Sequence, residues 1–302
     1  MRAELCAALV ARAERPDMVF LTGDLGFMAL EPLRDRLGAR FVNCGVAEQN
    51  MIGVASGLAR EGLEPWVYTI APFGYARAFE QIRNDVCLHG LSVRLLGNGG
   101  GYGYGVMGPT HHALEDYGSL LTLQGMTAFV PAFNEDVLPI VERTSMFGPS
   151  YIRLGRGELP AGAALPAYAP WRCLIAGDGP VIVAVGPLAG IAMAAIAELR
   201  AVRAELWVVS ELPSDGVRPP AEFVTRVAAS RRLCVIEEHC GQGGVGPMLA
   251  TWALHAGIML RGFRHLHARG YPSGRYGSQA FHRRESGIDA DGIHEAVLAL
   301  AA

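Results

Sequence analysis

The chain has 302 residues, of which 51% are hydrophobic and 18% charged, and its formal net charge is −3. This length allows two domains, each with its own core. The slightly acidic balance gives no electrostatic basis for binding nucleic acid or an anionic membrane, and no uninterrupted apolar stretch is long enough to span a bilayer. The six cysteines form no CxxC pair and the N-terminus lacks a signal-peptide core, which predicts a cytoplasmic protein with free thiols.

Short apolar runs alternate with helical patterns along the first half of the chain. Strands are expected at 18–22, 41–42, 66–70, 92–96, 127–131 and 151–154. Helices are expected at 47–60, 75–89, 111–123 and 135–146. This alternation predicts a mostly parallel sheet covered by helices on both faces.

The second half repeats the alternation after an uncharged Pro/Ala segment at 160–170, which we interpret as a linker. Strands are expected at 181–185, 205–209, 233–237 and 264–267. Helices are expected near 191–200 and 221–230, after 246, and at 293–300. The sequence therefore predicts an α/β protein with two domains, at residues 1–160 and 171–302.

Glu48 is the most informative single residue, because it shares the apolar face of its expected helix with Met51, Ile52 and Ala55. A carboxylate on such a face is desolvated, which favours its protonated form unless a cation pairs with it. A group of this kind is suited to sharing a proton near neutral pH. The alternative is a partly solvated first-turn Glu stabilised by the helix dipole.

The stretch 97–112, GNGGGYGYGVMGPTHH, is the second informative feature. Its many glycines allow the backbone to approach a ligand closely. Pro109 predicts the start of a helix, which would place His111 at a helix N-terminus and favour a neutral, hydrogen-bonding imidazole. The alternative is a flexible surface loop.

Other motifs are weaker. The glycines at 241, 243 and 246 follow an expected strand, as in a dinucleotide-binding turn, but tight packing of a helix on a strand explains them as well. Gly177-Asp178-Gly179 is similar to the start of a metal motif whose Asn ligand is missing downstream. The pairs His111/His112 and His265/His267 have no third ligand nearby, so no metal site is predicted.

Four stretches, GVAEQNMIGVASGLA, TIAPFGYARAFEQIR, GPTHHALED and SYIRLGRGELP, occur in this order. Together they resemble the pyrimidine-binding domain of transketolase and of 1-deoxyxylulose-5-phosphate synthase. CVIEEHCGQGG and GIDADGIHEAV look like the C-terminal domain of the same family. Nothing resembles the family's N-terminal domain, so the chain looks like the small subunit of a split transketolase.

The resemblance implies a transferase of aldehyde or ketone residues that uses thiamine diphosphate and moves a two-carbon ketol or acyl unit. Glu48 would bind the aminopyrimidine ring and share its proton, with Phe73 packing on the ring and Asp24 also at the cofactor site. His111 would contact the substrate, and Arg153 would bind a sugar phosphate. A large subunit, in an α2β2 heterotetramer, would hold the diphosphate and Mg²⁺ or another divalent cation.

Several positions depart from the family pattern. Met107 replaces an acid that reads a substrate hydroxyl, Gly99 replaces a His, and a Ser position falls near Met28. Arg2 is a further candidate for binding phosphate. These changes predict a substrate other than a standard sugar phosphate, or a 2-oxo acid donor such as pyruvate, unless Tyr104 or His112 supplies the missing polar group.

Two alternatives remain open at the level of the sequence. The first is the β subunit of a 2-oxo acid dehydrogenase, which shares the architecture but not the GVAEQN and GPTH motifs. The second is a non-catalytic regulatory subunit that keeps the fold. Glu48 argues against the second alternative, because a subunit without chemistry needs no buried acid.

Overall fold

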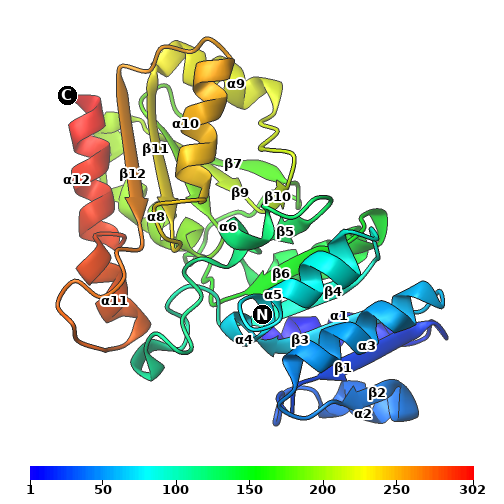
Figure 1. Cartoon of the computed structure of the whole chain (residues 1–302). Coiled ribbons are helices and arrows are strands. Elements are labelled where there is room, and N and C mark those ends of the chain that lie inside the picture. Colours follow the sequence, from blue (N-terminus) through cyan, green and yellow to red (C-terminus); the bar gives the residue numbers. More distant parts are fainter.

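The computed structural model describes all 302 residues, and its strands form two sheets (Figure 1). The first sheet has the order β10-β5-β6-β4-β3-β1-β2, and only the β10–β5 pair is antiparallel. Its strands are β1 (Met18–Thr22), β2 (Phe41–Asn43), β3 (Glu64–Ile70), β4 (Arg94–Asn98), β5 (Thr127–Phe129), β6 (Ser150–Leu154) and β10 (Glu211–Pro213). Because β10 lies beyond the expected linker, the second half of the chain completes the first sheet.

Helices cover both faces of this sheet. Successive side chains of a strand point to opposite faces, so Val19 and Leu21 of β1 enter one core while Met18 and Phe20 enter another. The helices are α1 (Arg2–Arg12), α2 (Glu31–Leu37), α3 (Glu48–Arg60), α4 (Ala71–Tyr75), α5 (Phe79–Gln81), α6 (Asp116–Leu120) and α7 (Val137–Arg143). Side chains of α3 and α4 pack in the first core and those of α1, α2 and α7 in the second.

The second sheet has the order β12-β11-β8-β9-β7, with β7 antiparallel to its neighbour. Its strands are β7 (Trp171–Ile175), β8 (Val181–Val185), β9 (Glu205–Val209), β11 (Arg232–Glu237) and β12 (Gly262–His267). Its helices are α8 (Leu188–Glu198), α9 (Ala221–Ser230), α10 (Val245–His255), α11 (Gln279–Ser286) and α12 (Ala290–Ala301). One hydrophobic cluster contains residues of both sheets, such as Val67 and Val235, so the two halves share a core. No helix combines the length and apolar character needed to cross a membrane.

Two expected helices are wrong in part. The helix expected at 111–123 is reduced to α6, and His111 lies in a turn, because Ala113 pairs with Gly101 in an antiparallel bridge. The helix expected at 75–89 is divided into the end of α4, α5 and a π-helical turn at Ile82–Cys87. The short elements α2, β7, β10 and α11 were not predicted.

Candidate functional site

Glu48 lies at the start of α3, below the carboxyl ends of β1 and β3, and is buried with 1% of its surface exposed. Its Oε1 accepts a hydrogen bond from Thr69 Oγ1 at 3.2 Å, and its Oε2 lies 2.7 Å from Arg77 Nη1. The Arg77 side chain is 47% exposed. The alternative of a partly solvated Glu48 is therefore wrong, and a cation that can reach solvent balances the buried charge.

The backbone next to the Glu48 carboxylate belongs to Gly23, which has no side chain. A Cβ on Gly23 would lie 3.5 Å from Glu48 Oε1, so the backbone at the end of β1 passes close to the carboxylate. Asp24, the next residue, has φ +59 and is exposed, and its Oδ1 accepts a hydrogen bond from Asn43 Nδ2 at 2.8 Å. Asp24 therefore borders the same strand end, while its predicted contact with the cofactor stays a prediction.

Aromatic side chains lie next to Glu48. The Phe73 ring stacks under the Arg77 guanidinium at 4.4 Å, and its centroid is 5.2 Å from that of His111. The His111 ring is in turn 5.6 Å from the ring of Tyr104. The structure thus brings Glu48, Phe73 and His111 into one site, although they are far apart in the sequence.

A basic pocket of about 210 Å³ continues from Tyr104. Arg2 and Arg156 line it together with Asn98, Gly99 and Tyr104. The Tyr104 ring fills the space that a side chain at position 99 would need, and its hydroxyl accepts a hydrogen bond from Asn98 at 2.7 Å. Sequence reasoning missed Arg156; the available signal was a second arginine just after the strand that contains Arg153.

Arg153 lies elsewhere in the protein. It is 4% exposed, forms an ion pair with Asp116 at 2.8 Å, and donates to the carbonyl oxygens of Ala113 and Glu238, each at 2.7 Å. Burial is the largest single influence and acts to lower the pKa of Arg153, but Asp116 together with neighbouring acidic and phenolic groups outweighs it and raises that pKa. The structure does not bring Arg153 to the pocket, and its predicted binding of phosphate stays a prediction that these contacts do not support.

The glycine turn at 241–246 binds a side chain of the chain itself. Glu237 accepts hydrogen bonds from the backbone N–H groups of Val245 and Gly246 at 2.8 Å and lies 2.6 Å from His265 Nε2. Burial acts to raise the pKa of Glu237, but these hydrogen bonds outweigh it and lower that pKa. The start of α10 is therefore filled by a carboxylate, which favours tight packing over a dinucleotide site.

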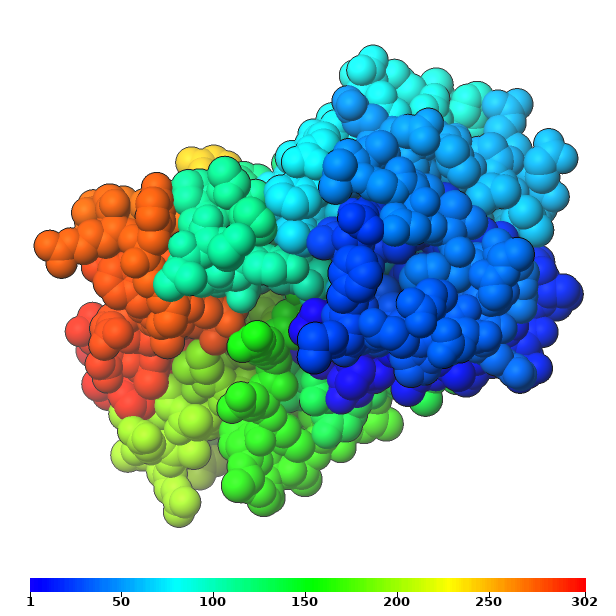
Figure 2. Space-filling view, turned by 90° about the horizontal axis from the view of Figure 1, so that it is seen from below, coloured from blue at the N-terminus to red at the C-terminus, as the bar shows by residue number.

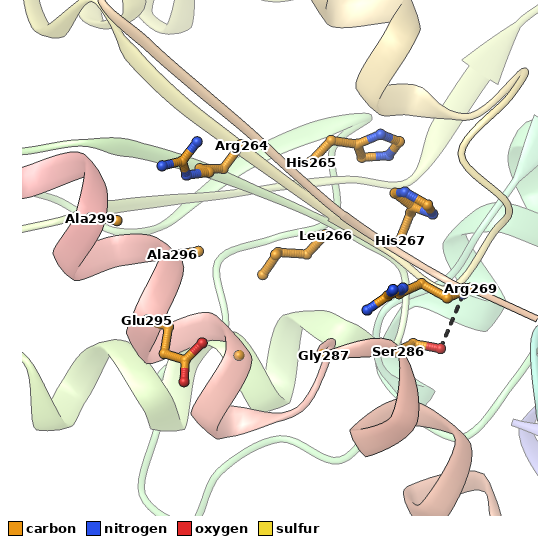
Figure 3. Close-up of a pocket in the computed structure, with 11 residues that line it drawn as sticks. Arg264, His265, Leu266, His267, Arg269, Ser286, Gly287, Glu295, Ala296 and Ala299 are labelled. Atoms are coloured by element: carbon orange, nitrogen blue, oxygen red, sulfur yellow. Dashed lines mark hydrogen bonds between the residues drawn. The ribbon is translucent and has the colours of Figure 1, made fainter. Parts of the chain in front are cut away.

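A separate pocket of about 420 Å³ lies in the second half, beside β12 and α12 (Figure 3). Arg264, Arg269 and Glu295 line it, so charges of both signs face it. None of the predicted site residues belongs to it. No group of three or more His, Cys, Asp or Glu side chains converges anywhere in the structure to hold a metal ion.

Comparison with known proteins connects this site to a family. Residues 4 to 161 match the family described as "Transketolase, pyrimidine binding domain". The chain is 32% identical over 268 residues to an apulose-4-phosphate transketolase subunit of Actinobacillus succinogenes, covering 86% of this chain and 85% of that protein. It is 33% identical over 308 residues to the 1-deoxy-D-xylulose-5-phosphate synthase of Myxococcus xanthus, covering 97% of this chain and 50% of that protein.

Solved structures agree with this relationship. A split gene transketolase, described as an inactive beta4 tetramer, superposes with a TM-score of 0.82 at 27% identity, covering 99% of this chain and 97% of that chain. The transketolase from Leishmania mexicana superposes with a TM-score of 0.80 at 17% identity, covering 99% of this chain and 45% of that chain, and shares the fold. The chain belongs to the thiamine-diphosphate-dependent transketolase family.

Proposed function

We propose that this chain binds the pyrimidine end of thiamine diphosphate at Glu48, Phe73 and the strand end formed by Gly23 and Asp24. The observation that carries the proposal is the buried Glu48 carboxylate, which lies beside an aromatic face and a bare backbone. A flat heteroaromatic ring with polar edges fits such a site, because one edge needs a buried hydrogen-bonding partner and the face needs an apolar one.

When bound, thiamine diphosphate supplies a nucleophilic carbon that takes a two-carbon unit from a donor and passes it to an acceptor. Glu48 holds or shares a proton at its carboxylate, where burial excludes competing water. Arg77 reaches solvent and pairs with Glu48 Oε2, so its guanidinium balances a negative charge on the buried carboxylate.

His111, Tyr104, Arg2 and Arg156 form the proposed substrate side of the site. The Nδ1 atom of His111 lies 2.9 Å from the Thr110 hydroxyl, so Nε2 is the nitrogen available to a substrate oxygen. Two guanidinium groups in one pocket suit a phosphate, which arginine binds through paired N–H donors. Tyr104 can supply the polar group that Gly99 lacks, whereas His112 is already bonded to Tyr271 and Gly105.

A large partner subunit completes the enzyme in this proposal. Val46, Phe27 and Met28, near the start of α3 and after β1, are 81%, 71% and 96% exposed, as expected for side chains that a partner covers. Two relatives are named as one of the subunits of a transketolase, which implies a further subunit. We infer that the partner holds the diphosphate and the divalent cation, and that two copies of each subunit form an α2β2 heterotetramer.

The proposed substrate is either a sugar phosphate outside the common pentose and hexose phosphates or a 2-oxo acid. Apulose 4-phosphate, named for two relatives of which this chain covers 85% and 78%, is the first candidate donor. Met107, 53% exposed within the glycine-rich loop, offers no hydrogen bond to a hydroxyl. Pyruvate is the second candidate donor, because the chain also aligns along 97% of its length with a 1-deoxy-D-xylulose-5-phosphate synthase.

The test is a donor comparison with the complex of this chain and its large subunit. Apulose 4-phosphate, pyruvate and xylulose 5-phosphate are each supplied at matched concentrations with thiamine diphosphate and Mg²⁺. We expect turnover with apulose 4-phosphate or pyruvate. Efficient turnover of xylulose 5-phosphate with ribose 5-phosphate, at kcat/KM of about 10⁴ M⁻¹s⁻¹ or more, would contradict the substrate proposal.

A further inference from the structure

The glycine-rich loop 99–112 is tied to the rest of the protein at its base. The backbone groups of Gly101 and Ala113 bond to each other in both directions, at 3.0 and 2.9 Å, and so close the loop. Tyr104 and His111 lie between these two residues. The position of the bridge therefore determines where both side chains enter the site.

Glu238, the residue after β11, binds the first end of this loop. Its Oε1 accepts from the backbone N–H of Tyr102 at 2.7 Å and from Gln279 Nε2 at 2.9 Å. Its Oε2 accepts from Arg283 Nε at 2.7 Å and lies 2.6 Å from Arg283 Nη2 in an ion pair. Glu238 is only 6% exposed, so a charged, buried carboxylate of the second sheet holds a backbone amide of the loop.

The second end of the loop is bound at the same place. Arg153 donates to the carbonyl oxygen of Ala113 and to the carbonyl oxygen of Glu238 itself. Asp116 balances the Arg153 charge. Glu238 therefore contacts one end of the loop through its side chain and the other end through its backbone and Arg153.

The side chain of Tyr102 contacts the second half of the chain. Tyr102 stacks on His282 of α11 at 4.9 Å and donates to the carbonyl oxygen of Gly270 at 2.9 Å. In Figure 2 the teal surface of the loop lies directly against the orange surface that precedes α11. The first sheet holds Gly99 and Gly100 through the Leu154 carbonyl, whereas the Tyr102 amide itself is bound by Glu238.

We propose that Glu238 is a positioning residue, through which the second half of the chain sets the place of His111 and Tyr104 and thereby the affinity for substrate. This inference rests on the proposed function, because it takes those two side chains to read the substrate. In Glu238→Gln the new amide group faces either the Tyr102 N–H or Arg283, so a donor opposes a donor in both orientations.

The experiment compares Glu238→Gln with Glu205→Gln in the complex with the large subunit. Glu205 is a matched control, because it is 4% exposed and paired with Arg226 at 2.6 Å but is remote from the loop. We expect KM for the substrate to rise about tenfold in Glu238→Gln, with kcat nearly unchanged. The same KM in both variants would overturn the proposal.

Two further measurements separate this inference from the proposed function. Hydrogen exchange of residues 99–112 can be measured without enzyme activity. We expect the Tyr102 amide to exchange faster in Glu238→Gln but not in Glu205→Gln. Unchanged protection of this amide would overturn the positioning role even if the enzyme is active. In a His111→Gln background, Glu238→Gln should have a much smaller effect on KM, since coupled residues are not additive. Full additivity would show that Glu238 does not act through His111.

Discussion

The carboxylate of Glu48 is the residue on which the proposed chemistry depends. Its neighbours are a hydroxyl, a guanidinium and the backbone of Gly23. The Arg77 charge keeps burial from being prohibitive, because a buried charge needs a partner. Both oxygens of Glu48 therefore have partners within the chain.

Glu48→Gln should leave assembly intact and remove most turnover. The change preserves size but removes proton sharing, so we expect kcat to fall by about 10²-fold or more. Steady-state rates of the complex check this, with Glu61→Gln, an exposed residue just beyond the same helix, as the control. A Glu48→Gln complex that keeps more than about half its rate would remove Glu48 from the proposed role.

Arg156→Met should raise KM for a phosphorylated substrate by about 10- to 100-fold, because one charge-assisted set of hydrogen bonds is removed. The same substitution at Arg60, at the end of α3, should leave KM unchanged. Steady-state kinetics with phosphorylated and non-phosphorylated forms of one substrate give the comparison. An equal change for both forms would show that Arg156 does not bind the phosphate.

At the scale of elements, three histidines join the loop and α6 to the second half of the chain. His112 hydrogen-bonds to Gly105 and Tyr271, and His239 accepts from the Gly118 N–H at 3.1 Å. His282 stacks on Tyr102 at 4.9 Å and accepts from the Gly277 N–H at 3.2 Å. Burial lowers the pKa of each of the three. The acceptor roles of His239 and His282 require neutral rings, and burial favours the neutral form of His112 as well.

These lowered pKa values predict a loss of stability in mild acid. In the unfolded chain these histidines have a pKa of about 6.5, so below that pH the unfolded chain binds more protons than the folded chain. The contribution of these histidines to the free energy of unfolding should therefore be fully present above that pH. It should decrease as the pH falls toward the lowered pKa values of the folded state. Urea unfolding between pH 5 and pH 7.5 measures the slope, and His112→Gln should make it shallower. An unchanged slope in that variant would exclude His112 as a contributor.

Strands were easier to predict than loops. The runs 18–22, 181–185 and 205–209 were predicted with the correct bounds, because strands buried on both faces are apolar throughout. The polar helix α11 was missed, because distant partners such as Glu238 hold it in place. The loop could be recognised from its glycines, but not its bridge to Ala113, which replaced the first turn of the expected helix.

The site could be predicted only where chemistry is local to a motif. The helical period places Glu48 on the apolar face of its helix, and the resemblance of its motif to the family predicted its role. Arg153 and Arg156 are separated by one short turn, and their opposite environments follow from the tertiary structure. No pattern within the sequence distinguishes a guanidinium buried against Asp116 from one that lines a pocket.

At the scale of the whole molecule, this chain forms only one side of the proposed cofactor site. The exposed Val46, Phe27 and Met28 mark the side that a partner would cover. The chain alone should therefore bind thiamine diphosphate weakly, even with Mg²⁺. Calorimetry of the isolated chain and of the complex with the large subunit checks this. Micromolar affinity without the partner would contradict the shared site.

Because β10 belongs to the first sheet, the two halves of the chain should not fold correctly when they are produced as separate polypeptides. Leu212, 1% exposed, and its neighbours pair with β5 at the edge of the first sheet, although they follow the Pro/Ala segment in the chain. A peptide ending near residue 160 would leave β5 with an open edge, which invites pairing between molecules. We expect insertions in the Pro/Ala segment to be tolerated, whereas cleavage there should leave two fragments that stay associated and aggregate once they are separated.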